Sequence, residues 1–296
     1  MPSILTRDQI VGVVATGFAV KRPELERGVS RLEEMGFRVL QGEHLFEREG
    51  YLAGNDFARA DDLLSMLKRP DLAAIWFARG GYGTTRLLKW LQPALLAKSR
   101  PALIGYSDLT ALFAASQKKG GRRCLYGPVV TELGDSGAFH AGSLRAALAG
   151  KEQIVRFRRS AQWLPGSADG ILVGGNLTVL NSLCGTRFMP SFKDKILLLE
   201  DVGEPTYRID RMLTQMRDAG LFKQLRGVLL GSMTPAVRKR FPPDRDLKDV
   251  VVECFEPLAV PLVSDLPIGH LAGKKTVILG APVAIDGAAR RVVFGS

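Results

Sequence analysis

Few residues in this sequence could act as the base that activates a serine or cysteine nucleophile. The chain has only three histidines, His44, His140 and His270, and such a nucleophile needs a base within hydrogen-bond reach. His44 lies in a charged segment, and His140 lies in a stretch of small residues typical of a surface loop. His270 instead follows the turn Leu266–Gly269, where the end of a strand would present its side chain. His270 is therefore the best candidate base, with a purely structural histidine as the alternative.

Ser107 lies between an expected strand, Ala102–Gly105, and an expected helix, Leu109–Gln117. A strand–turn–helix junction is where a nucleophile elbow exposes its serine, and the first N–H groups of the helix can stabilise an oxyanion. Ser, Asp and Thr are also frequent N-cap residues, so capping of the following helix by Ser107, Asp108 or Thr110 is the alternative. Leu109 stands where Gly-x-Ser-x-Gly has its second glycine. This departure argues against an ordinary α/β-hydrolase.

Glu200 and Asp201 end the apolar run Ile196–Leu199, which predicts a buried strand that finishes in carboxylates. A carboxylate at a strand end can orient a histidine and stabilise its imidazolium form. It can also bind a divalent cation through oxygen, or lie in a solvated loop and cap the following helix. The residues themselves leave these three interpretations open.

Two glycine-rich segments follow other apolar runs, Arg79–Gly83 and Gly174–Asn176. Glycine lets a ligand approach the backbone closely, and successive N–H groups can bind an oxyanion or a carboxylate. Neither segment matches the phosphate-binding loop or the dinucleotide-binding fingerprint. The sequence therefore gives little support to nucleotide binding.

The first half of the chain alternates apolar runs with amphipathic stretches, which predicts a parallel sheet with helical crossovers. The expected strands are Ile10–Ala15, Arg38–Leu40, Ala73–Phe77 and Ala102–Gly105, and the expected helices are Pro23–Met35, Asp56–Leu67, Thr84–Leu91 and Leu109–Gln117. Ligands bind beyond the carboxyl ends of strands in such sheets, which directs attention to residues 78–83 and 106–108. We predict a Rossmann-like N-terminal domain over residues 1–150.

The second half of the chain has a different pattern of apolar runs. Residues 151–167 lose periodicity and contain Pro165 and Gly166, which predicts a linker into a second domain over residues 168–296. The expected strands are Ile171–Val173, Ile196–Leu199, Gly227–Leu230, Pro261–Ser264, Val277–Leu279 and Val292–Phe294, with helices at Asp210–Ala219 and Leu247–Phe255. The predicted fold class is α/β, with a smaller C-terminal domain built on a mixed or barrel-like sheet.

The composition is that of a folded globular chain, with 46% hydrophobic and 24% charged residues among 296. The sequence has no run of about 18 apolar residues, the length that a membrane-spanning helix needs. The N-terminus lacks the pattern of a signal peptide. We therefore expect a cytoplasmic protein without a membrane partner. Cys124, Cys184 and Cys254 are too few and too far apart for a disulfide framework or a paired-cysteine metal site.

The formal net charge of +11 favours anionic partners through long-range attraction. The basic residues are spread over the whole length and are not interleaved with aromatic residues as in platforms for single-stranded nucleic acid. Nucleic-acid binding, with purely structural glycine segments, is therefore the lesser alternative.

Five motifs taken in order resemble the serine L,D-carboxypeptidases, the family of murein tetrapeptide carboxypeptidases and microcin C immunity hydrolases. They are Ala78–Gly83, Gly105–Leu112, Gly174–Leu177, Leu199–Glu204 with Tyr207–Asp210, and Leu266–His270. Each motif is short, but their order along residues 10 to about 282 makes the resemblance specific.

By this resemblance, Ser107 is the nucleophile, His270 the base and Glu200 the acid of a Ser–His–Glu triad. The resemblance also implies an oxyanion hole formed by the backbone N–H groups of Gly81 and Asp108. It implies acyl transfer without a cofactor or a metal ion, at a site between the two domains.

The substrate-binding residues implied by the resemblance are Arg79, Tyr82 and Asn176. The implied reaction releases the terminal D-Ala of the murein tetrapeptide L-Ala-D-Glu-diaminopimelate-D-Ala in peptidoglycan recycling, by a homodimeric enzyme. The immunity branch of the family cleaves peptide–nucleotide conjugates and needs an aromatic side chain that stacks on the base. Between Leu180 and Pro190 the chain offers only Phe188, so the peptidoglycan substrate is favoured.

Overall fold

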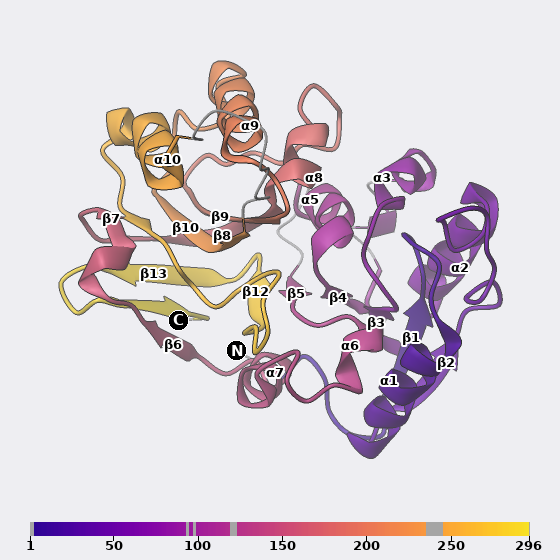
Figure 1. The fold of residues 1–296 in the computed structure, drawn as a ribbon. Helices are drawn as coiled ribbons and strands as arrows, with labels where there is room; N and C mark the ends of the chain where they lie inside the picture. The colour runs from indigo at the N-terminus through magenta and orange to yellow at the C-terminus, as the bar shows by residue number, and fades with distance from the viewer. Residues whose placement is uncertain (1–2, 93–94, 97–98, 119–122, 235–244, 296) are drawn as a thin grey trace.

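The computed structural model describes residues 3–92, 95–96, 99–118, 123–234 and 245–295 (Figure 1). Two sheets organise these residues, and each belongs mainly to one half of the chain. No helix among the described residues is long and apolar enough to cross a membrane.

The first sheet has six strands in the order β12-β5-β4-β3-β1-β2. Its strands are β1 (Ile10–Val14), β2 (Arg38–Gln41), β3 (Leu72–Phe77), β4 (Ala102–Gly105), β5 (Cys124–Tyr126) and β12 (Val277–Leu279). All neighbours are parallel except β12, which pairs antiparallel with β5. The predicted parallel-sheet N-terminal domain is thus confirmed.

Helices cover both faces of this sheet (Figure 1). They are α1 (Arg22–Glu34), α2 (Asp56–Lys68), α3 (Thr84–Leu87), α5 (Thr110–Gln117), α6 (Val130–Leu133) and α7 (Ala141–Leu148), with short 3₁₀ turns η1 (Leu88–Trp90) and η2 (Ser107–Leu109). Side chains of β1 alternate between the faces: Val13 packs in the same buried cluster as Leu25 of α1, whereas Val14 packs in the cluster of Leu63 of α2. This alternation explains why the strand reads as a continuous apolar run.

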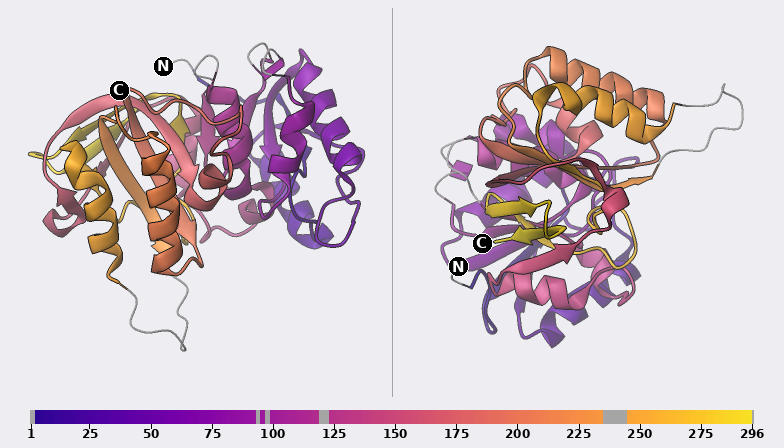
Figure 2. Two further views of the ribbon diagram at one scale, coloured as in Figure 1. Left: turned by 90° about the horizontal axis from the view of Figure 1, so that it is seen from above. Right: turned by 90° about the vertical axis from the view of Figure 1, so that its left-hand side faces the viewer.

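The second sheet has eight strands in the order β6-β14-β13-β8-β9-β10-β11-β7. Its strands are β6 (Gln153–Arg156), β7 (Gln162–Leu164), β8 (Ala168–Asn176), β9 (Lys195–Val202), β10 (Gly227–Thr234), β11 (Leu262–Val263), β13 (Pro282–Asp286) and β14 (Arg291–Phe294). The central strands β8 to β11 are parallel and the outer pairings are antiparallel. The predicted mixed sheet is confirmed, and the sheet curls (Figure 2).

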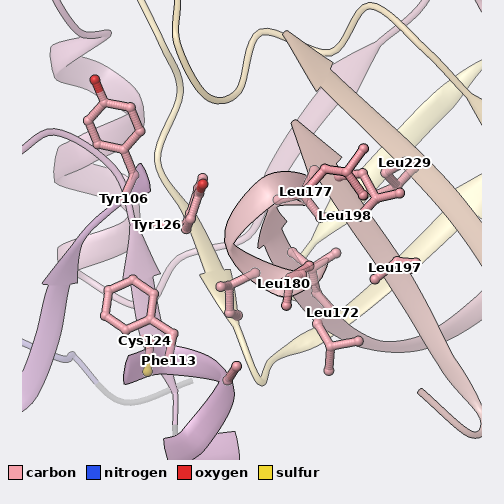
Figure 3. Close-up of a cluster of buried hydrophobic side chains, with 14 of the residues drawn as sticks. Tyr106, Phe113, Cys124, Tyr126, Leu172, Leu177, Leu180, Leu197, Leu198 and Leu229 are labelled. Atoms are coloured by element: carbon pink, nitrogen blue, oxygen red, sulfur yellow. The ribbon is translucent and has the colours of Figure 1, made fainter. Parts of the chain in front are cut away.

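The helical elements of the second half are α8 (Leu177–Ser182), α9 (Thr206–Asp218) and α10 (Leu247–Phe255), with 3₁₀ turns η3 (Arg159–Ala161) and η4 (Glu256–Leu258). Helices α9 and α10 lie side by side on the second sheet (Figure 2). Helix α8 packs against α5 of the first half, and one buried apolar cluster continues from Phe113 and Tyr126 to Leu177 and Leu180 (Figure 3). The two halves therefore share a continuous core.

Two segments lie elsewhere than the sequence pattern predicts. Residues 151–167, predicted as a linker, contain β6 and β7, which are the two edge strands of the second sheet. Val277–Leu279, predicted within the C-terminal domain, forms β12 at the edge of the first sheet. Both segments are short, and periodicity predicts an extended conformation without specifying the strand with which it pairs.

Candidate active site

Ser107 begins η2, directly after β4, and its backbone has a left-handed conformation with φ of 65°. This conformation is uncommon for a residue with a Cβ atom and marks strain held by the surrounding structure. Among the described residues the Ser107 hydroxyl is hydrogen-bonded to a side chain and not to the start of a helix: its Oγ lies 3.0 Å from Nε2 of His270. The capping interpretation is thus replaced by a serine–histidine pair that joins the two halves of the chain.

His270 lies in the loop after β11, and its Nδ1 atom is 2.6 Å from Oε2 of Glu200 on β9. The backbone N–H of His270 donates to the same carboxylate oxygen at 3.2 Å. A carboxylate only accepts, so Nδ1 carries a proton and Nε2 is left to accept the proton of the Ser107 hydroxyl. Burial lowers the pKa of His270, but the hydrogen bond and the negative charge of Glu200 outweigh it, and the pKa is raised above its ordinary value of 6.5.

Glu200 is fully buried and receives further hydrogen bonds on its other oxygen, Oε1. The Tyr126 hydroxyl donates to Oε1 at 2.7 Å, and Nδ2 of Asn176 lies 3.4 Å from it. Tyr126 also accepts the backbone N–H of Ser107 at 3.3 Å. The Tyr126 hydroxyl therefore links the backbone of Ser107 to the carboxylate of Glu200. Burial raises the pKa of Tyr126, so its hydroxyl keeps the proton that it donates.

Asp201 follows Glu200 and turns its carboxylate toward α8. It accepts hydrogen bonds from the backbone N–H and the hydroxyl of Thr178, from Nδ2 of Asn176 and from the N–H of Val202. Burial raises the pKa of Asp201 against these hydrogen bonds. Among the described residues, no three His, Cys, Asp or Glu side chains are grouped as a metal site requires. Glu200 is thus hydrogen-bonded to a histidine, as the orienting interpretation requires, and Asp201 bonds to the residues at the start of α8.

The two predicted oxyanion donors share a cleft with Ser107. Gly81 and Asp108 line the same cleft as the serine, and the neighbouring Gly80 lies so close that an added Cβ would be 3.1 Å from Cβ of Ser107. Gly81 has φ of 107°, which favours glycine, and a Cβ there would collide with the ring of Phe18. Neither N–H donates to any turn, loop or cap acceptor in the part of the chain that the structure describes. Both groups are thus available to a ligand oxygen.

Arg59 on α2 fixes the shape of the glycine segment, a role that the sequence pattern does not indicate. Its guanidinium is buried and donates to the carbonyl groups of Thr16, Gly54 and Gly83. Asp56 pairs with it at 2.5 Å. A lone arginine within an amphipathic helix gives no signal for this role, because only the fold brings three carbonyl groups to it.

Replacing this arginine should destabilise the protein. Arg59→Met leaves the three carbonyl groups without their donor inside the protein, and we expect the free energy of unfolding to fall by about 3–5 kcal/mol. Urea unfolding followed by circular dichroism measures the change. Arg69→Met is the matched control, because Arg69 is exposed and its salt-bridge partner among the described residues, Asp71, is exposed as well, and it should cost at most about 1 kcal/mol. Equal losses in the two variants would contradict the proposed role of Arg59 in holding the three carbonyl groups.

The site residues line a cleft of about 480 Å³ between the two halves. Ser107, His270, Tyr82 and Asn176 contribute to its wall. Asn176 also caps α8, since its Oδ1 accepts the N–H of Val179 at 3.0 Å.

The remaining predicted substrate residue, Arg79, is not among the cleft-lining residues that the structure describes. Its guanidinium donates to the carbonyl of Ala19 at 3.2 Å. Despite the net charge of +11, no lysine or arginine is found in the described lining, which contains Asp108, Asp201 and Glu204.

The second glycine segment has a different use from the ligand approach that its sequence suggests. Gly174 and Gly175 lie within β8, and a Cβ on Gly175 would come within 2.6 Å of Oγ1 of Thr110. The backbone N–H of Asn176 donates to the same hydroxyl at 3.0 Å. Glycine there allows the second sheet to approach α5 and so brings Glu200 within reach of the serine half.

A second polar network, also missed from the sequence, supports the other side of the imidazole. The ring of Tyr106 packs on that of His270 with centroids 4.8 Å apart. The Tyr106 hydroxyl donates to Glu132 at 2.7 Å, and buried Lys274 pairs with the same oxygen at 2.8 Å. The histidine is thereby held between a carboxylate and an aromatic ring.

The site is that of a serine hydrolase in its geometry, and comparison with known proteins makes it a serine carboxypeptidase and gives its family. Residues 11–127 match the LD-carboxypeptidase N-terminal domain and residues 169–285 match the LD-carboxypeptidase C-terminal domain. The chain belongs to the LD-carboxypeptidase family, as the five motifs predicted.

Several relatives cover nearly the whole chain. A Synechocystis protein that carries a carboxypeptidase name is 36% identical over 97% of this chain and 94% of its own length. The murein tetrapeptide carboxypeptidase of Pseudomonas aeruginosa is 34% identical over 95% of this chain and 94% of its own.

Solved structures are similar over the same extent. The muramoyltetrapeptide carboxypeptidase from Oxalobacter formigenes has a TM-score of 0.84 and 28% identity, covering 97% of this chain and 99% of its own. MccF in complex with glutamyl sulfamoyl guanosine has a TM-score of 0.87 and 21% identity, covering 99% of this chain and 98% of its own. The likeness to MccF concerns the fold alone.

Proposed function

We propose that the protein releases the terminal D-Ala from the murein tetrapeptide L-Ala-D-Glu-diaminopimelate-D-Ala. The observation that carries this proposal is the hydrogen-bonded series Ser107–His270–Glu200 in a cleft beside two available backbone N–H groups. The names of the Pseudomonas and Oxalobacter relatives support a murein peptide as the substrate.

The reaction proceeds in two half-reactions. Ser107 Oγ attacks the carbonyl carbon of diaminopimelate while His270 Nε2 takes its proton, and the N–H groups of Gly81 and Asp108 stabilise the oxyanion. The C–N bond breaks as His270 returns the proton to the amine of D-Ala, which leaves an ester on Ser107. A water molecule, deprotonated by His270, then hydrolyses the ester and frees the tripeptide. Glu200 stabilises the imidazolium form in both half-reactions.

Mass spectrometry of the purified tetrapeptide after incubation with the wild-type protein tests the proposal. Release of D-Ala, with a tripeptide of matching mass, is the expected result. If the tetrapeptide stays intact while the pentapeptide or an aminoacyl-nucleotide conjugate is cleaved, the substrate assignment is wrong even though the site is active.

The immunity-type hydrolase is the alternative function, but the cleft offers little for a nucleobase. Phe188 is absent from the described cleft lining and packs against Arg187. Trp163 lines a separate cavity of about 130 Å³. Among the described lining residues, Tyr82 is the one Phe, Tyr or Trp side chain. Cleavage of a peptide–nucleotide conjugate faster than of the tetrapeptide would reverse the preference.

The cellular setting forms part of the proposal. We propose that the protein acts in the cytoplasm, where it trims murein peptides that are being recycled. That it forms a homodimer remains a prediction of the family resemblance. Analytical ultracentrifugation measures the oligomeric state. Nucleic-acid binding remains the lesser alternative, and affinity for DNA or RNA that falls steeply between 50 and 200 mM salt would support it.

The pH dependence should report the state of His270. The base must be neutral to accept the proton of Ser107, so kcat/KM rises with pH as His270 loses its proton. Because the pKa of His270 is raised, the midpoint of this acid limb should lie above pH 6.5. Initial rates of D-Ala release at low substrate concentration between pH 5 and 9 give the midpoint. A midpoint below 6.5 in the wild-type protein would contradict the influence of Glu200.

A further inference from the structure

The cleft wall carries acids, and only one of them has a carboxylate that the protein leaves accessible among the described lining residues. Asp108 is buried and accepts the backbone N–H of Thr84 at 2.9 Å. Asp201 is buried as well, and four donors within the protein surround it. Glu204 lines the same cleft, and its side chain is 18% exposed. Glu204 is therefore the lining carboxylate able to meet a charged part of the substrate.

Glu204 has a cationic neighbour one helical turn further along the chain. Nη1 of Arg208, in the first part of α9, lies 3.4 Å from Oε2 of Glu204. Charge-assisted hydrogen bonds are usually about 2.7–2.9 Å long, so this contact is loose. The Arg208 side chain is 39% exposed, and a guanidinium has five N–H donors. Arg208 lies outside the described cleft lining and also hydrogen-bonds to Tyr207, but its guanidinium is next to the lining residue Glu204. With donors to spare on Arg208 and an accessible carboxylate on Glu204, both members of the pair can accept a further partner beside the cleft.

A negative and a positive group side by side are complementary to a ligand that carries adjacent ammonium and carboxylate groups. The distal centre of diaminopimelate is such a group, because it keeps a free amino acid head beyond the acyl carbon that Ser107 attacks. A lysine side chain at the same position ends in an ammonium group alone. The pair can therefore distinguish the two kinds of stem peptide.

We infer that Glu204 and Arg208 form a specificity site for the distal head group of diaminopimelate, with Glu204 binding its ammonium and Arg208 its carboxylate. This inference rests on the proposed function. Bound in this way, the head group replaces one loose ion pair with two charge-assisted contacts. Each contact between charged groups contributes roughly a 10- to 100-fold preference.

Three tetrapeptides test the site: one with meso-diaminopimelate, one with diaminopimelate amidated at the distal carboxyl, and one with L-lysine. Wild-type kcat/KM for D-Ala release should be highest for the first peptide, by about 10- to 100-fold. Arg208→Gln should remove most of this preference, because it lowers kcat/KM for the first peptide much more than for the other two. Glu204→Gln should lower kcat/KM for all three, since each carries the ammonium group.

Arg211→Gln is the matched control, because Arg211 is exposed on the same helix, and it should keep the wild-type order of the three peptides. Equal losses on all three peptides in Arg208→Gln would overturn the assignment, because Arg208 would then serve a part of the substrate that they share, such as the D-Ala carboxylate. A wild-type enzyme that cleaves the three peptides equally well would also overturn it. If none of them is cleaved, the proposed function itself fails and the specificity site falls with it.

Discussion

Ser107→Ala should lower kcat for D-Ala release by about 10⁶-fold, the scale of loss when the nucleophile of a serine-hydrolase triad is removed. The expected loss is large because Ser107 supplies the hydroxyl that is hydrogen-bonded to His270 Nε2 among the described residues. Alanine keeps the Cβ atom, so the packing against Gly80 is unchanged. Single-turnover kinetics with the tetrapeptide, followed by mass spectrometry, measures the effect.

The fold of this variant must be verified alongside its rate. The hydroxyl makes one hydrogen bond in the structure, that to His270, and the backbone N–H bond to Tyr126 does not depend on the side chain. The thermal midpoint should therefore stay close to the wild-type value. A folded Ser107→Ala protein that still releases D-Ala at the wild-type rate would show that another residue is the nucleophile. It would remove the triad from the mechanism.

The three central residues could be predicted because each ends or follows a buried apolar run. Ser107 follows β4, Glu200 lies near the end of β9, and His270 follows the short β11. The carboxyl ends of parallel strands meet at one edge of a sheet, so strand prediction alone narrows the search to few positions. The scarcity of histidines then leaves little choice of base.

The supporting residues could not be predicted in the same way. Tyr126 ends β5, a strand of three residues that gives too short a pattern to recognise. Arg59 and Lys274 are cations that a reader of the sequence places at the surface, yet both are buried. Their partners are carbonyl groups and a carboxylate distant in sequence. Only the tertiary fold brings these groups together, so neither periodicity nor motif spacing predicts the contacts between them.

The junction between the halves shows the same limit. The Gly-Gly-Asn segment could be recognised as unusual, but its sequence does not say what approaches the glycines. In the structure Thr110 of α5 takes that space and accepts the N–H of Asn176. The sequence also does not predict that β12 pairs with the first sheet, because three apolar residues could form a strand of either sheet.

Glu200→Gln should lower kcat by about 10⁴-fold, the scale seen when the acid of such a triad is made neutral. Four donors converge on the Glu200 carboxylate: the Tyr126 hydroxyl and Asn176 Nδ2 on one oxygen, and Nδ1 and the backbone N–H of His270 on the other. A glutamine offers one acceptor oxygen and one NH₂ group to these four donors. The NH₂ group of the glutamine must therefore face donors, either His270 on one side or Tyr126 and Asn176 on the other.

Either orientation of the amide impairs the base. If the NH₂ group faces His270, Nδ1 becomes the acceptor and Nε2 carries the proton, so it cannot accept the proton of Ser107. If the oxygen faces His270, the tautomer survives, but the negative charge that stabilises the imidazolium is lost and Tyr126 faces a donor. Burial, which lowers the pKa of His270, then acts without that opposing charge. The acid limb of kcat/KM should consequently move to lower pH as the rate falls.

Tyr126→Phe separates this effect from a general disturbance of the buried network. It removes one donor from Glu200 but keeps the bond between Glu200 and His270, so its acid limb should stay above pH 6.5. The two variants are compared through their pH profiles of kcat/KM, with circular dichroism as the check of folding. A Glu200→Gln enzyme with an unshifted acid limb and a loss no larger than that of Tyr126→Phe would show that Glu200 only packs. The shift in pH, more than the loss of rate, distinguishes an orienting acid from a structural one, because Glu200 contributes most to raising the pKa of His270, ahead of the charge of Asp201.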